Sequence, residues 1–122
     1  MLTQRNPDIA YRRVDFDARV SSASPAELVK MCYEQLVSAL GRALIAQERG
    51  DNRLKSEALT RAVSALNALQ MGVSGEGSMA DALHQLYTSA RRAVLDSVLS
   101  FDSGAIARIR QDFIDIAAAL NG

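Results

Sequence analysis

The stretch Ser22-Ala23-Ser24-Pro25-Ala26-Glu27-Leu28-Val29 decides where the folded body of the chain begins. Ser24 is suited to be a helix N-cap, because its hydroxyl can accept a hydrogen bond from a free backbone N–H of the first turn. Pro25 then falls at the first helical position, where the missing N–H of proline costs nothing. Glu27 can reach back to the N–H of Ser24 and close a capping box. A long helix is therefore predicted to start at Pro25.

Four segments carry apolar residues at intervals of three and four, the spacing of one face of a helix. The predicted helices span residues 25–49, 52–71, 79–100 and 104–120. Gly50 is a typical stop signal for the first helix. Candidate N-caps for the other three are Asp51 or Asn52, Ser78, and Asp102 or Ser103. Alternating β-branched runs, which would indicate strands, are absent from the sequence.

Four helices joined by short connections predict an all-α fold, an antiparallel four-helix bundle formed by residues 24–122. Residues 1–23 precede the bundle as an N-terminal arm. The arm carries too many apolar side chains for a solvated tail, namely Ile9, Tyr11, Val14, Phe16 and Val20. We therefore expect it to be partly ordered, to dock on the bundle and to cover part of a partner-binding groove until the partner arrives.

The composition limits the classes of protein to which the chain can belong. Its 122 residues suffice for one domain with one core. Fourteen basic and fourteen acidic residues give a formal net charge of zero. This balance argues against a nucleic-acid-binding protein and against a polybasic membrane anchor. It is compatible with self-association, so we expect a monomer or a homodimer.

Cysteine usage and hydropathy predict a cytoplasmic protein. Cys32 is the only cysteine, which excludes an internal disulfide and fits a reducing compartment. It lies between Leu28 and Leu36 on an apolar stripe, so a buried thiol is expected. The first twenty residues contain no apolar h-region of a secretory signal. No stretch approaches the roughly 20 apolar residues of a spanning helix, so membrane insertion is not expected.

No cluster of residues in the sequence indicates catalysis, a metal or a cofactor, and we predict that the protein is not an enzyme. Gly72, Gly75 and Gly77 have the wrong spacing for a phosphate-binding loop. A di-metal site in a bundle needs a repeated Glu-x-x-His, whereas Asp81-x-x-His84 occurs once. His84 leaves one alternative open, because histidine phosphotransfer domains are regulatory four-helix bundles of this size with one phosphoryl-accepting histidine.

A set of short motifs extends from about residue 10 to residue 118. In chain order they are Ala10-Tyr11, Ser22-Ala23-Ser24-Pro25, Tyr33-Glu34, Gly50-Asp51, Glu57-Ala58-Leu59, Leu83-x-x-Leu86-Tyr87 and Arg91-Arg92. With these motifs the chain resembles the flagellin-specific export chaperone family, FliS. Ser-Ala-Ser-Pro before an apolar helix is fairly specific when the tyrosine spacing and Leu-x-x-Leu-Tyr also hold.

The resemblance implies a cytoplasmic helical bundle that binds the disordered C-terminal segment of flagellin. That segment folds into helices in hydrophobic grooves of the chaperone, which prevents premature polymerisation before export. The export gate of the flagellum is implied as a second partner. On this basis we expect partner contacts at Ile9, Tyr11, Leu54, Leu59, Leu83, Tyr87 and Val94.

Overall fold

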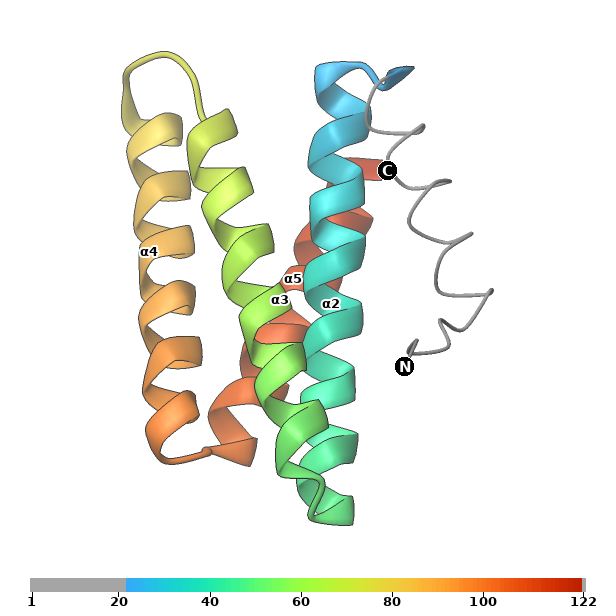
Figure 1. Cartoon of the computed structure of the whole chain (residues 1–122). Helices are drawn as coiled ribbons and strands as arrows, with labels where there is room; N and C mark the ends of the chain where they lie inside the picture. Colours follow the sequence, from blue (N-terminus) through green and yellow to red (C-terminus); the bar gives the residue numbers. More distant parts are fainter. Residues whose placement is uncertain (1–21, 122) are drawn as a thin grey trace, which may run out of the picture.

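The computed structural model describes residues 22–121, which form four helices with short connections (Figure 1). The helices are α2 (Pro25–Arg49), α3 (Asn52–Gly72), α4 (Ser78–Leu99) and α5 (Ser103–Asn121). Successive helices run in opposite directions, which confirms the predicted all-α antiparallel bundle. The predicted helix ends lie within one residue of the observed ones. Residues 1–21 of the predicted arm lie outside the described residues, so its docking and the division at residue 24 stay predictions.

The start of α2 contains the predicted capping box. The backbone N–H of Glu27 donates to the Ser24 hydroxyl over 3.2 Å, and the N–H of Ser24 donates to the Glu27 carboxylate over 3.2 Å. The Ser24 hydroxyl also donates to this carboxylate, and these hydrogen bonds lower the pKa of Glu27. At the other end of α2, Gly50 adopts φ 68°, the left-handed conformation that terminates helices at low steric cost.

Aspartates cap two of the remaining helices. The carboxylate of Asp51 accepts from the N–H of Leu54, and that of Asp102 accepts from the N–H of Ala105, each over 3.0 Å. The prediction that Ser78 caps α4 is wrong, because Ser78 is already the first helical residue. Gly77 precedes it at φ 115°, so the glycine lets the chain turn into the helix one residue earlier than expected.

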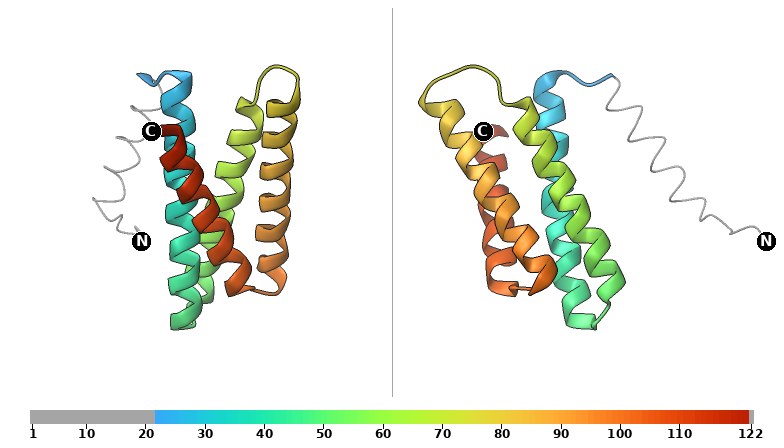
Figure 2. Two further views of the ribbon diagram at one scale, coloured as in Figure 1. Left: turned by 180° about the vertical axis from the view of Figure 1, so that it is seen from behind. Right: turned by 60° about the vertical axis from the view of Figure 1, so that its left-hand side comes forward.

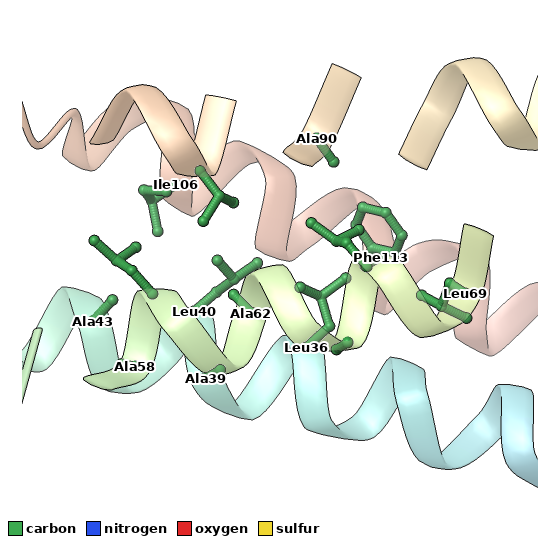
Figure 3. Close-up of a cluster of buried hydrophobic side chains, with 14 of the residues drawn as sticks. Leu36, Ala39, Leu40, Ala43, Ala58, Ala62, Leu69, Ala90, Ile106 and Phe113 are labelled. Carbon is green, nitrogen blue, oxygen red and sulfur yellow. The ribbon is translucent and has the colours of Figure 1, made fainter. Parts of the chain in front are cut away.

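Small side chains allow α2 and α3 to pack closely, and this pair has the most extensive contact in the described bundle. Both helices present buried alanines at intervals of three and four. These are Ala39, Ala43 and Ala46 on α2, and Ala58, Ala62 and Ala65 on α3. Leu36 and Leu40 lie among them in the core cluster that Figure 3 shows. The α2–α3 pair is therefore the centre of the fold.

The other two helices attach to different members of this pair. Helix α4 packs mainly on α3, α5 packs mainly on α2, and α4 and α5 contact each other only slightly. Figure 2 shows that α4 and α5 are joined at one end and diverge toward the N-terminal end of α2. The buried side chains Ile106 and Phe113 of α5 close the core.

The divergence of α4 and α5 explains why several apolar side chains are only half-buried. Leu83, Leu86 and Ile116 pack against the core without being covered completely. Cys32 is half-buried as well, so the expectation of a fully buried thiol is wrong. It lies near the N-terminal end of α2 and packs against the edge of the core cluster. The remaining burial still raises the pKa of the thiol.

The alanine-lined contact predicts a strong effect of side-chain size at Ala62. Replacing this fully buried residue by leucine should destabilise the protein by about 1–3 kcal/mol, because three added carbon atoms must force α2 and α3 apart. Ala68→Leu is the matched control, since Ala68 is exposed on the same helix. It should change stability by less than about 0.5 kcal/mol. Urea unfolding followed by circular dichroism measures both, and equal effects would show that the contact tolerates larger side chains.

Candidate partner-binding groove

An open groove of about 860 Å³ lies between α2 and α5. Its lining extends from Ala26 to Ser38 on α2 and from Arg110 to Leu120 on α5. The lining residues are Ala26, Glu27, Val29, Lys30, Tyr33, Glu34, Val37 and Ser38 on α2, and Arg110, Ile114, Ala117 and Leu120 on α5. The groove exists because α2 carries apolar residues on more than the face that contacts α3.

The two walls of the groove carry apolar residues at helical intervals on faces that no other described helix covers completely. On α2, Val29, Tyr33 and Val37 recur at intervals of four residues, so they lie above one another on one side of the helix. On α5, Ile114 and Ala117 provide the facing apolar surface, and Leu120 beyond them is 65% exposed. Two apolar stripes that face each other across an open channel suit the apolar face of a third helix.

Tyr33 connects the groove to the core. Its hydroxyl lies 2.8 Å from that of Tyr87 in a buried hydrogen bond. The Tyr33 ring also packs against Phe113 with ring centroids 5.4 Å apart, and Tyr87 packs against Phe113 at 6.1 Å. Burial and the hydrogen bond to Tyr87 raise the pKa of Tyr33, so this hydroxyl stays neutral. The inner side of the groove is therefore fixed by an aromatic cluster from three helices.

Arg110 brings a cation into the groove from α5. Its Nε–H donates to the backbone carbonyl of Val37 on α2 over 3.2 Å. Gly41, one turn further along α2, permits this approach, since a Cβ at position 41 would lie 3.1 Å from the Arg110 Nε. Within residues 22–121, the only ion pair joins Arg53 to Glu57 on α3, so Arg110 has no carboxylate partner there.

Of the residues predicted to contact a partner, the five that the structure describes do not line this groove. Leu59, Tyr87 and Val94 are buried in the core, with exposed fractions of 1%, 3% and 0%. Leu54 and Leu83 are half-buried near the starts of α3 and α4, which lie at opposite ends of the bundle. Ile9 and Tyr11 lie outside the described residues. A role of these seven residues in partner binding stays a prediction.

The sequence contains a signal for the groove that the prediction did not use. The apolar face of the first helix is too wide for one neighbour, because Val29 and Val37 lie beside the stripe that faces α3. On the fourth helix, Ile114 and Ala117 lie beside Phe113 in the same way. These flanking positions, rather than the stripes themselves, mark the open surface.

The other candidate sites offer less for chemistry. His84 is exposed on α4, whereas Tyr87, one turn later, is buried. A second hollow of about 140 Å³ lies between α4 and α5 beside Leu86 and Phe113. The described part of the chain contains no group of three or more His, Cys, Asp or Glu residues that could hold a metal ion. Among its helices, none combines the length and apolar character that spanning a bilayer requires.

The described residues thus define an all-helical bundle with an open apolar groove, an arrangement that can receive the apolar face of an amphipathic helix. A family model described as flagellar protein FliS matches residues 7–120. The chain therefore belongs to the FliS family, as the sequence resemblance indicated.

Three characterised relatives carry the name flagellar secretion chaperone FliS. The Salmonella typhimurium protein is 36% identical over 113 residues, covering 90% of this chain and 84% of the relative. The Vibrio cholerae protein is 32% identical over 80 residues, covering 64% and 59%. The Escherichia coli protein is 27% identical over 113 residues, covering 90% and 83%. The similarity to the first and third relatives thus extends over nearly the whole chain.

The contribution of the Tyr33–Tyr87 hydrogen bond to the stability of the protein can be tested by substitution. Tyr33→Phe or Tyr87→Phe alone should destabilise the protein by about 1–3 kcal/mol, because each leaves one buried hydroxyl without a partner. The double variant should lose less than the sum of the two, since it leaves neither hydroxyl unpaired. Denaturant unfolding of the three variants measures this coupling. Strict additivity would show that the hydrogen bond contributes nothing.

The raised pKa of Tyr33 also predicts a pH dependence. In the unfolded chain Tyr33 ionises near the ordinary tyrosine pKa of about 10. In the folded protein it ionises only at higher pH, so its contribution to stability is complete below pH 10 and is lost as the pH rises further. The melting temperature should fall above pH 10, and less steeply in Tyr33→Phe. Parallel curves for the two proteins would contradict this assignment.

Proposed function

We propose that this protein is a cytoplasmic secretion chaperone of the flagellum that binds the C-terminal segment of flagellin in the α2–α5 groove. Membership of the FliS family and the name of its relatives support the chaperone role. The single structural observation that supports the binding site is the apolar groove itself, which presents Val29, Val37, Ile114 and Ala117 to solvent. The proposed role requires binding and release, and no catalytic step.

The dimensions of the groove fit a short amphipathic helix. From Ala26 to Ser38 the α2 wall rises by twelve residues, about 18 Å at 1.5 Å per residue. This length accommodates about three turns of a bound helix. The bound segment would insert its apolar face between α2 and α5 and leave its polar face in water.

A disordered ligand explains how binding and release can both occur. A segment that becomes helical only on the chaperone loses conformational entropy when it binds, so part of the interaction energy is spent on ordering it. The complex can then bury a large apolar surface and still release flagellin for export. While bound, the segment is unable to pair with other flagellin subunits, which prevents premature polymerisation. We propose the export gate as the second partner, which receives the loaded chaperone.

The test places one negative charge inside the groove and the same charge beside it. Ala117→Glu introduces a carboxylate on the groove side of α5, whereas Ala118→Glu introduces it on the exposed side of the same turn. Calorimetric titration with the C-terminal peptide of the organism's own flagellin should show binding at least about tenfold weaker for the first variant, because the charge must be desolvated. Ala118→Glu should bind like the unmodified protein.

Circular dichroism adds a second readout. The spectrum of the mixture should contain more helix than the sum of the separate spectra, because the peptide orders on binding. Absence of heat and of excess helix with the unmodified protein would refute flagellin binding. Normal binding by Ala117→Glu would leave the chaperone role standing and place the site elsewhere on the bundle.

A further inference from the structure

We infer that Arg110 is the anion anchor of the groove and that it binds an aspartate or glutamate side chain on the docked flagellin helix. The inference rests on the proposed function of the groove and adds a chemical requirement that the bound segment must meet. It follows from the hydrogen bond that positions Arg110 and from the absence of a carboxylate partner for this residue within residues 22–121.

The guanidinium group of Arg110 is held against α2 at one point. Its Nε–H donates to the Val37 carbonyl over 3.2 Å, although Arg110 belongs to α5. This carbonyl is accessible because Gly41 has no side chain, and a Cβ there would lie only 3.1 Å from the same nitrogen. Among residues 22–121 this hydrogen bond through Nε is the one that Arg110 makes, so the two terminal nitrogens of the guanidinium group keep N–H donors that no described residue uses.

Two features of this arrangement lower the stability of the fold, so a contribution to stability does not explain them. Glycine in a helix interior destabilises the helix relative to alanine, and Gly41 lies in the middle of α2. Arg110 is partly buried against an apolar surface, yet no carboxylate of residues 22–121 pairs with it. Partial burial weakens the hydration of the cation, and no ion pair within residues 22–121 compensates for this loss. A fixed cation without an acidic partner among the described residues is what a binding site for an anion requires.

The other charges of the groove do not satisfy Arg110. Glu27 is engaged with Ser24 in the capping box. Lys30 and Glu34 are exposed, and within the described residues Glu34 forms no ion pair with Arg110. Arg110 is therefore the cation inside the groove that a docked helix would meet.

A carboxylate is the ligand that fits the available geometry. A guanidinium group offers parallel N–H donors that match the two oxygens of a carboxylate, and such charge-assisted bonds are about twice as strong as neutral ones. The docked helix must place its acidic residue at the margin of its apolar face, where it can reach Arg110 while the apolar residues fill the channel. This contact would select among amphipathic segments that hydrophobicity alone does not distinguish.

The experiment compares two charge reversals on α5. Arg110→Glu removes the anchor, whereas Arg108→Glu makes the same change at an exposed position outside the groove. With the flagellin C-terminal peptide, calorimetry should show at least about tenfold weaker binding for Arg110→Glu, the scale of a lost charge-assisted bond. Arg108→Glu should stay within about twofold of the unmodified protein. Equal affinities for all three proteins would overturn the inference and leave the proposed function intact.

A charge swap identifies the carboxylate. Peptides in which each aspartate or glutamate is replaced in turn by lysine are titrated against Arg110→Glu. One of them should regain most of the lost affinity, because it restores an opposite pair across the contact. If Arg110→Glu binds weakly and no replacement restores binding, carboxylate recognition is refuted. If the unmodified protein fails to bind the unmodified peptide, the proposed function itself fails.

Gly41→Ala tests whether the position of the Arg110 guanidinium group matters for binding, and it changes no charge. The added methyl group must displace the Nε atom, so binding should weaken several-fold. The melting temperature should stay the same or rise, because alanine favours the helix more than glycine does. This variant keeps the inference testable even where Arg110→Glu proves unfolded. Unchanged affinity of Gly41→Ala would show that the position of the guanidinium group is irrelevant to binding.

Discussion

The close contact between α2 and α3 is the constraint on which the rest of the structure depends. Alanines at intervals of three and four on both helices let the two backbones approach, and leucines between them fill the remaining space. Once this pair is formed, each helix has another face left to cover. Helix α4 covers α3 and α5 covers α2, so neither outer helix needs extensive contact with the other.

The groove follows from this division of contacts. In a symmetric bundle every helix would have two close neighbours, and the apolar residues of α2 would be covered on both sides. Here α5 crosses α2 at an angle, and the other described helices leave Val29 and Val37 only partly covered. The aromatic cluster of Tyr33, Tyr87 and Phe113 fixes the inner side of this opening from three helices. The groove and the core are thus continuous.

Local rules predicted the helices well, whereas the groove depends on long-range packing that they do not contain. Ser24, Glu27 and Gly50 act within a few residues of chain, so their roles can be read directly from the sequence. Periodicity identifies apolar side chains without naming their neighbours, which is why Leu59, Tyr87 and Val94 proved to be core residues. The contact of Arg110 with Val37 joins residues 73 positions apart and has no local pattern.

The walls of the groove come from the first and the last helix of the described bundle, and this has a consequence for synthesis. A growing chain can pair α2 with α3 as soon as both have left the ribosome, because their contacts are local in sequence. The second wall is absent until α5, the last of the four described helices in chain order, has been synthesised and has docked. The groove is therefore completed only when α5 packs against α2, so a chain that lacks α5 also lacks one wall of this surface.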